Sequence, residues 1–288
     1  MRFGLVDELY QLSSFAIKNT QIIFTGKDTE NSLIASVREY CDEYGFPDAI
    51  SAGFPATIDK KRKKVISAPN IKGLNNLPVA DILEQALGIP VFVNRDTNFL
   101  LLYDVYHYQL DELANIIGCY IGTGFGNAVL INGRILLGKN GAAAELGHIP
   151  MLGKSAVCGC GNVGCIEAYA SGKHLSEIRE SCFPDTHITD IFSKHSADEA
   201  IEQFIDQLSL PVATEINIFD PDHVIVGGGV IQMKDFPLKR FEERIRVHSR
   251  KPFPESNLDI IYSYPKQENG VIGAGIYAYK RLADGGYV

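Results

Sequence analysis

Residues 145–167 read ELGHIPMLGKSAVCGCGNVGCIE and hold a dense group of metal-binding side chains. His148 is followed, after nine intervening residues, by Cys158, Cys160 and Cys165, which fall within eight positions. Glycines beside the cysteines let the backbone turn tightly. Three thiolates and one imidazole suit tetrahedral zinc and leave no coordination position open. We therefore expect a structural zinc site that orders a loop; the alternative is a set of reduced cysteines beside an unrelated histidine.

The remaining cysteines and the overall composition indicate an ordinary globular protein. Cys41, Cys119 and Cys182 stand far apart, so they do not suggest a disulfide framework. The chain has 288 residues, 45% of them hydrophobic, which suits about two domains. Its net charge of −8 makes nucleic acid and anionic membranes poor partners. No stretch approaches the roughly 18 apolar residues of a membrane span, and charged residues interrupt the start where a signal peptide needs an apolar core. The sequence predicts a cytoplasmic protein.

Strands and helices are expected to alternate, which indicates an α/β protein with a mixed sheet in each half. Residues 15–17 and 22–24 are expected to pair around Asn19-Thr20, and the basic run 59–64 to form a solvated hairpin turn. The division into domains is expected at 1–110 and 111–288. The other expected strands are 49–53, 57–58, 65–66, 90–93, 116–121, 128–131, 224–226 and 258–262, and the expected helices are 29–44, 77–87, 97–108, 196–218, 236–247 and 271–282.

Asp96 is a candidate catalytic residue because the predicted strand 90–93 delivers Asn94-Arg95-Asp96 at its carboxyl end. Open α/β sheets bind their ligands at that end of the strands. A carboxylate there could accept the proton of an attacking hydroxyl. As an alternative, Asp96 could serve only as the N-cap of the following helix.

Two glycine-rich loops are candidate nucleotide-binding elements. Gly122-Thr123-Gly124-Phe125-Gly126 joins two predicted strands and offers backbone amides and a hydroxyl to phosphate oxygens. Gly227-Gly228-Gly229 follows a predicted buried strand, where a nucleotide could approach the backbone. Neither matches the Walker lysine pattern or the dinucleotide fingerprint. A glycine-rich hairpin and a tight turn are the alternatives.

Taken together, these motifs resemble the ROK family of sugar kinases over nearly the whole chain. The resemblance rests on Glu145-Leu146-Gly147-His148, the cysteine loop with Glu167 after it, the two glycine loops, and the stretch from Asn217 through Asp220-Pro221. Within the family, the likeness is to bacterial D-allose kinases, in which the usual asparagine before the catalytic aspartate is likewise an arginine, here Arg95. Residues 53–56, 67–70 and 145–150 share this likeness.

The resemblance implies an actin/hexokinase-like (ribonuclease H-like) two-domain α/β fold with a central cleft and a zinc-binding loop. Residues 1–110 would form the small domain and 111–288 the larger one, with the last helix packing back on the small domain. It implies ATP-dependent phosphorylation of a hexose hydroxyl, most simply D-allose to its 6-phosphate, with Mg²⁺ accompanying ATP and Zn²⁺ as a structural ion. The implied roles are Asp96 as general base; Arg95, Glu145, His148 and Glu167 as sugar ligands; Gly122, Thr123 and Gly124 at the nucleotide phosphates; Gly227, Gly228 and Gly229 at the adenosine; and His148, Cys158, Cys160 and Cys165 as metal ligands.

Some expectations depart from the family pattern or stay open. Relatives begin with a strand and an Asp-x-Gly-Gly-Thr turn that would lie before Met1, so we expect a misplaced start, a truncation or a degenerate kinase. A non-catalytic sugar-binding protein is therefore an alternative to the enzyme. A kinase for glucose, fructose or N-acetylmannosamine is another, because a guanidinium in place of an amide at Arg95 alters which hydroxyls bind. The resemblance also suggests a homodimer.

Overall fold

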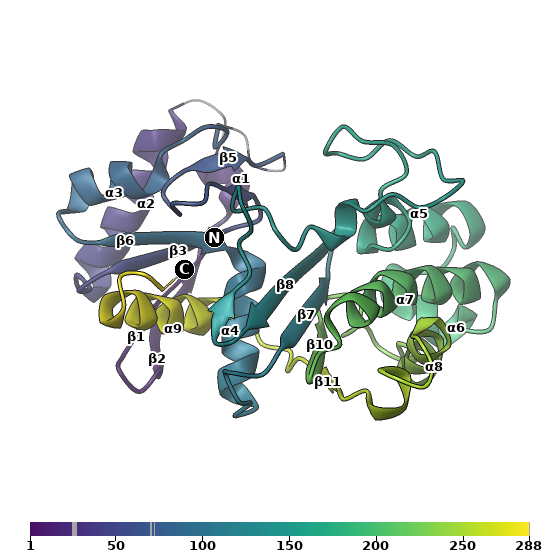
Figure 1. Ribbon diagram of the computed structural model, residues 1–288. Helices are drawn as coiled ribbons and strands as arrows, with labels where there is room; N and C mark the ends of the chain where they lie inside the picture. Colours follow the sequence, from purple (N-terminus) through teal and green to yellow (C-terminus); the bar gives the residue numbers. More distant parts are fainter. Residues whose placement is uncertain (25–27, 70, 72, 288) are drawn as a thin grey trace. The chain divides into compact units, whose positions relative to one another are not determined.

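The computed structural model describes residues 1–24, 28–69, 71 and 73–287 (Figure 1). Asn70, the last residue of the motif at 67–70, lies outside the described residues. The chain forms two compact units. The first comprises Met1–Leu110, Arg134–Ala143 and Lys266–Val288, and the second comprises Asp111–Gly133 and Ala144–Pro265. Among the described residues, no helix is both long enough and apolar enough to cross a membrane.

The described part of the first unit combines short strands with five helices, and its parallel strand pair leads to Asp96. Its strands are β1 (Arg2–Val6), β2 (Leu12–Ile17), β3 (Ile50–Phe54), β4 (Thr57–Ile58), β5 (Val65–Ser67), β6 (Val91–Arg95) and β9 (Arg134–Ile135); its helices are α1 (Thr20–Ile23), α2 (Thr29–Tyr44), α3 (Val79–Leu87), α4 (Asp96–His107) and α9 (Asn269–Ala283). β3 and β6 run parallel, with Ile50 opposite Val91 and Phe54 opposite Arg95. The hairpin of β4 and β5 and the helix at 29–44 confirm the sequence predictions.

The predicted strand pair at residues 15–17 and 22–24 is wrong. β2 pairs instead with β1, around a turn in which the Asp7 carboxylate accepts hydrogen bonds from the backbone of Leu9 and Gln11. The Asn19-Thr20 signal begins a helix, because the Asn19 side chain accepts a hydrogen bond from the Gln21 N–H and so caps α1. Asparagine favours both turns and N-caps, and the local sequence does not distinguish them.

Two further expectations for the first unit need correction. Apart from β9, its described strands form separate pairs, β1 with β2, β3 with β6 and β4 with β5, and not one mixed sheet. The basic run at 59–64 is not wholly solvated, since Arg62 is only 2% exposed. Its backbone has φ 56°, in the left-handed region. Burial lowers the pKa of Arg62 to about 10, and its Nη1 donates to the Ile58 carbonyl at 3.5 Å.

The second unit is built on a mixed sheet, as expected. Its strands are β7 (Ile116–Ile121), β8 (Phe125–Ile131), β10 (His223–Gly227) and β11 (Ile260–Tyr262), and its helices are α5 (Gly172–Cys182), α6 (Ile191–His195), α7 (Glu199–Phe219) and α8 (Leu238–His248). Four short 3-10 turns complete it: η1 (Leu146–His148), η2 (Ile166–Ala168), η3 (Ile188–Asp190) and η4 (Glu255–Asn257). Within the unit the strand order is β11-β10-β7-β8; β7, β10 and β11 run parallel, and β8 is antiparallel to β7.

Helix α5 was not expected from the sequence, although a local signal exists. The Ser171 side chain accepts a hydrogen bond from the His174 N–H and caps the helix. Helix α7 runs unbroken through Pro211. It occupies Glu199–Phe219, where one long helix was expected at 196–218. Its face toward the sheet is fully buried, with Ile201, Phe204 and Leu208 inaccessible to solvent.

Close packing of α9 on α4 organises the core of the first unit. A Cβ at Gly273 of α9 would lie 1.9 Å from the Phe99 carbonyl oxygen of α4. The Phe99 and Tyr277 rings contact each other with centroids 5.4 Å apart. Only glycine allows the two backbones to approach this closely. The approach holds α4, and therefore its first residue Asp96, against α9.

We predict that Gly273→Ala destabilises the protein by about 3 kcal/mol, because the added methyl group must push α9 away from α4. Thermal unfolding measures the effect, and the midpoint should fall by several degrees. Gly270→Ala is the matched control in the same helix, since its nearest neighbour is a Leu100 methyl group at 3.9 Å. An unchanged midpoint for Gly273→Ala would contradict the proposed packing constraint.

Candidate functional site

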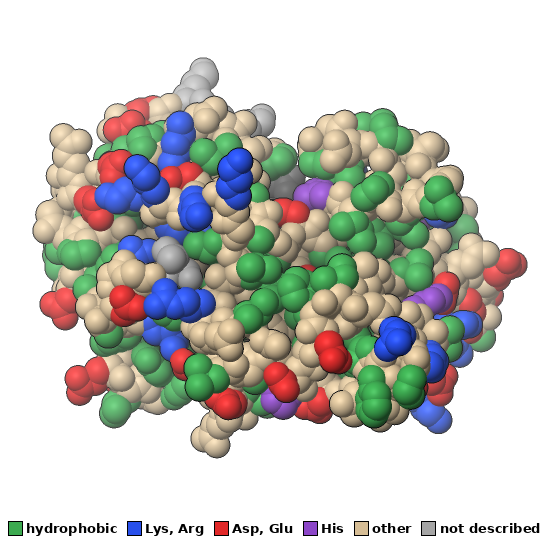
Figure 2. Space-filling view, viewed as in Figure 1, with side chains coloured by type: hydrophobic (Ala, Val, Ile, Leu, Met, Phe, Trp, Pro, Cys, Tyr) green, Lys and Arg blue, Asp and Glu red, His purple; other side chains and the backbone are tan. Residues whose placement is uncertain are grey.

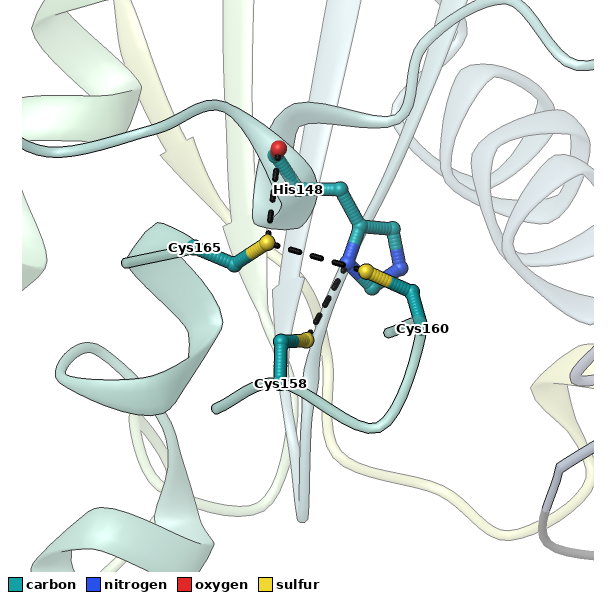
Figure 3. Close-up of side chains that lie close together, drawn as sticks. All are labelled: His148, Cys158, Cys160 and Cys165. Atoms are coloured by element: carbon teal, nitrogen blue, oxygen red, sulfur yellow. Dashed lines mark hydrogen bonds between the residues drawn. The ribbon is translucent and has the colours of Figure 1, made fainter. Parts of the chain in front are cut away.

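The four expected metal ligands come together in the second unit (Figure 3). Their ligand atoms all lie within 4.8 Å of one another. His148 ends η1, Cys165 immediately precedes η2, and Cys158 and Cys160 lie in the loop between these turns. The His148 Nδ1 faces the Cys158 Sγ at 3.6 Å, and the Cys160 and Cys165 sulfur atoms are 3.7 Å apart. The sequence spacing therefore predicted a real cluster.

These separations fit a tetrahedral zinc ion. Two thiolates at the usual zinc–sulfur distance and a tetrahedral angle lie about 3.8 Å apart, and an imidazole nitrogen lies about 3.6 Å from a thiolate. Burial raises the pKa of Cys165 to about 12, so a nearby cation would favour its thiolate form. With four donors already present, such an ion would have no position left for water. The donor set fits a structural role.

The loop that carries the cysteines folds around backbone turns. The Cys158 N–H donates to the Asn162 carbonyl, and the Gly161 N–H donates to the Cys158 carbonyl. Gly164 has φ 76°, and a Cβ there would lie 2.6 Å from the Lys154 carbonyl oxygen. Glycine is therefore required at 164 both by its backbone angle and by the close approach.

Two carboxylates lie close to η1, the turn that ends at His148. The Nε2 of His148 lies 3.7 Å from an oxygen of Glu145, and both side chains are about one-third exposed. A Glu167 oxygen accepts a hydrogen bond from the Phe125 N–H at 2.9 Å, at the start of β8. A Cβ at Gly124 would meet that oxygen, so a larger residue there would displace the Glu167 carboxylate. Glu167 is thus fixed directly on the glycine loop.

The two glycine loops are neighbours within the second unit. They follow β7 and β10, which pair in parallel with Gly227 opposite Tyr120. A Cβ on Gly228 would lie within 2.4–2.6 Å of the Ile121 backbone, and Gly228 has φ 96°. At Gly122 and Gly229 nothing would touch an added Cβ, so these positions face open space. The Gly122 N–H donates to the Gly124 carbonyl and the Gly122 carbonyl accepts from the Gly172 N–H, so close backbone packing and hydrogen bonds hold this loop beside open space.

Asp96 stands at the junction of β6 and α4 in the first unit. The N-cap position belongs to Arg95, so the alternative of Asp96 as the N-cap is wrong by one residue. Its carboxylate accepts a hydrogen bond from the Thr97 N–H at 2.9 Å. Burial nevertheless raises the pKa of Asp96 above its ordinary value of 3.8. A raised pKa is typical of a carboxylate used as a general base.

Arg95 is buried beside Asp96, and its side chain has a fixed direction. Its Nη1 donates to the Ala143 carbonyl at 3.1 Å. The neighbouring Asn94, which is inaccessible to solvent, accepts hydrogen bonds from the Arg95 N–H and the Asn98 amide. The end of β6 is therefore a hydrogen-bonded polar junction, of which the sequence revealed only Arg95 and Asp96.

Sequence reasoning missed the buried polar residues that support η1. Asn127 of β8 and Glu215 of α7 are almost inaccessible, and the Asn127 amide donates to Glu215. They lie 88 positions apart, so no local pattern connects them. The isolated cysteines also differ in their environments, since Cys41 and Cys119 are buried and Cys182 is exposed.

Residues 9–281 match the sequence model of the ROK family. The chain belongs to the ROK family. It is 25% identical to the glucokinase of Thermotoga maritima, over 97% of this chain and 94% of that protein. It is 28% identical to the N-acetyl-D-glucosamine kinase of Vibrio cholerae, over 86% of each.

A solved structure supports the same fold. The ROK family glucokinase from Streptomyces griseus, in complex with glucose and AMPPNP, superposes with a TM-score of 0.79 and 26% identity, covering 96% of this chain and 95% of that one. The actin- and hexokinase-like α/β kinase fold is therefore confirmed. ROK family membership with these relatives also confirms the expectation of a sugar kinase, that is, a phosphotransferase.

We predict that the purified protein binds about one equivalent of zinc per chain and that Cys160→Ser weakens zinc binding at least about tenfold. Elemental analysis and chelator competition measure both quantities. Cys182→Ser is the matched control, because Cys182 is also exposed but lies outside the cluster. Equal zinc affinities for Cys160→Ser and Cys182→Ser would contradict the assigned ligand set.

Proposed function

We propose that this ROK family protein transfers a phosphoryl group from ATP to a hydroxyl of a hexose, with D-allose as the substrate and its 6-phosphate as the product. The observation that carries the proposal is the Asp96 carboxylate at the carboxyl end of β6, where burial raises its pKa. A carboxylate with a raised pKa accepts a proton more readily than an ordinary aspartate. Asp96 is thus the general base that takes the proton of the attacking hydroxyl.

The second unit supplies the substrate-binding groups in this proposal. The Glu145 and Glu167 carboxylates accept hydrogen bonds from the sugar hydroxyls, and the His148 ring donates one. Glu145 and His148 are accessible enough to do so. The Nε2 of His148 is available for the sugar because Nδ1 faces the cysteine cluster. A bound zinc ion would fix the His148 ring and leave the chemistry to other groups.

The glycine loops hold the nucleotide in this proposal. Gly122, Thr123 and Gly124 contact the phosphates, and Gly227, Gly228 and Gly229 line the adenosine. The open space at Gly122 and Gly229 supports these roles. Mg²⁺ bound with ATP supplies neutralisation of the negative charge on the phosphates. We further propose that the protein acts as a homodimer in the cytoplasm, as the family resemblance suggests.

Arg95 supports D-allose over the sugars named for the relatives. The Arg95 guanidinium carries only hydrogen-bond donors, and its direction is fixed by the Ala143 carbonyl. A fixed donor selects hydroxyls by their configuration, since a hydroxyl on the opposite face of the ring cannot reach it. Glucose, fructose and N-acetylmannosamine are the alternative substrates, and a sugar-binding protein without activity is the alternative function.

Replacement of Asp96 should abolish turnover while leaving sugar binding in place. We predict that Asp96→Asn lowers kcat by about 10²–10⁴-fold, because general-base catalysis contributes this much. ADP release with zinc-loaded protein, Mg²⁺ and ATP measures it. Asp81→Asn is the control, as Asp81 lies in the first turn of α3 and is paired with Lys63 at the surface. Full activity of Asp96→Asn would remove the assigned base.

The pH dependence of kcat/KM should reflect the pKa of the same carboxylate. The base works only when deprotonated, so activity falls as the pH drops through the pKa of Asp96. Because burial raises that pKa, we predict that kcat/KM falls on the acid side above the ordinary value of 3.8. A profile that stays flat down to that value would contradict the raised pKa.

A panel of sugars tests the substrate. We predict that kcat/KM is highest for D-allose among D-allose, glucose, fructose, mannose and N-acetylmannosamine. Arg95→Asn should lower the preference for D-allose over glucose at least about tenfold, because the fixed donor is lost. Arg38→Asn is the control, since Arg38 also donates to a carbonyl in the first unit, that of Ala86. An unchanged preference in Arg95→Asn would assign specificity elsewhere.

A further inference from the structure

A buried polar network in the second unit lies outside the groups assigned to the reaction. Glu215 of α7 is 3% exposed, and Asn127 of β8 and Cys119 of β7 are inaccessible to solvent. The Asn127 amide nitrogen donates to one oxygen of Glu215, and the other oxygen lies 3.6 Å from the Cys119 sulfur. A buried carboxylate is costly unless it is hydrogen-bonded, so a residue of this kind calls for an explanation.

The chemistry of Glu215 fixes the direction of the Asn127 side chain. The Asn127 NH₂ group can only donate, and it donates to a Glu215 carboxyl oxygen, so this end of the amide faces Glu215. The Asn127 oxygen must then point the other way. There it accepts a buried hydrogen bond from the Leu146 N–H at 3.0 Å. Glu215 thereby determines which end of the amide is offered to Leu146.

Leu146 begins η1, the turn that ends at His148. Glu145 directly precedes it, so the Leu146 N–H lies between the two proposed sugar ligands along the chain. The next residue, Gly147, packs so closely on β8 that a Cβ would lie 2.5 Å from the Phe125 carbonyl oxygen. The Phe125 N–H in turn donates to Glu167. Residues 125–127 of β8 therefore anchor both η1 and Glu167.

We propose that Glu215 is a positioning residue for sugar recognition: through the Asn127 amide it sets the position of η1, and with it Glu145 and His148. Glu215 is assigned no contact with the sugar or with ATP, and it is not one of the four proposed metal ligands. Its role rests on the proposed function, because it acts on the side chains assigned there to the sugar. Loss of the carboxylate leaves the Asn127 amide free to reverse, which would turn an NH₂ group toward the Leu146 N–H.

The test uses zinc-loaded full-length protein and the variants Glu215→Met and Glu215→Gln. Methionine keeps the length of the side chain and offers only a weakly accepting thioether, whereas glutamine keeps an oxygen that can accept from Asn127. We expect Glu215→Met to raise the KM for the sugar about tenfold, with kcat and the KM for ATP changed less than about threefold. Glu215→Gln should stay within about threefold of the parent in all three quantities. Ser209→Ala is the control, because Ser209 is equally buried on α7 and bonds only to its own helix.

A double-mutant cycle tests whether Glu215 acts through Asn127. Asn127→Met should raise the KM for the sugar as Glu215→Met does, and the double variant should be no worse than Asn127→Met alone. Replacement of both hydrogen-bonding partners by apolar groups can be nearly neutral for stability. The double variant therefore keeps the test decisive if Glu215→Met alone does not fold. Additive effects on KM would overturn the proposal.

A second readout does not depend on kinase activity. Co²⁺ substituted for zinc reports the geometry of its ligands through its visible absorption, and His148 is one of those proposed ligands. We expect the Co²⁺ spectrum to change in folded Glu215→Met and to be retained in Glu215→Gln and Ser209→Ala. Unchanged spectra and sugar KM in Glu215→Met would overturn the inference. Absence of turnover in the parent protein would overturn the proposed function alone, because the spectra would still decide the role of Glu215.

Discussion

The approach of four side chains to a single point, His148 with Cys158, Cys160 and Cys165, is the constraint on which the candidate sugar-binding face depends. The loop around them has little apolar core, since Leu152, Val157 and Val163 are 102%, 77% and 57% exposed. Figure 2 shows hydrophobic side chains on the molecular surface at the upper right, where this loop lies in Figure 1. A loop that buries so little needs another source of order, which a structural metal bound at the proposed site would provide. Because His148 belongs both to the cluster and to η1, order in the loop extends to Glu145.

Close backbone contacts extend this constraint through the second unit. Gly147 lies against the Phe125 carbonyl, and Gly228 lies against the Ile121 backbone. At each position a Cβ would come closer than side chains ever do. The glycines are therefore required by packing as much as by any ligand, and they explain how two loops and two carboxylates keep fixed positions on β7, β8 and β10. In the first unit, close packing at Gly273 likewise fixes the position of α4 and therefore of Asp96.

The sequence predicted the parts of this arrangement that depend on local chemistry. His148 and the three cysteines are close in the chain, so their residue types and spacing sufficed to predict that these side chains cluster. Helix α3 ends at Leu87, where the helix expected at 77–87 also ends, and Gly88 follows in the left-handed region, which favours a helix stop. Asn19 and Asp96 show the limit of local signals, since a turn and an N-cap look alike and an N-cap can be misplaced by one residue. Asn127 and Glu215 escaped prediction because the fold alone brings them together, and a buried glutamate looks like a surface glutamate in sequence.

Metal binding at the cysteine cluster should organise sugar recognition and leave nucleotide binding unchanged. Calorimetric titration of metal-free and zinc-loaded protein with D-allose, and separately with a non-hydrolysable ATP analogue, tests it most directly. The account predicts that metal removal weakens sugar binding at least about tenfold, that zinc restores it, and that nucleotide affinity changes less than about threefold. Equal sugar affinity in folded, metal-free protein would contradict it.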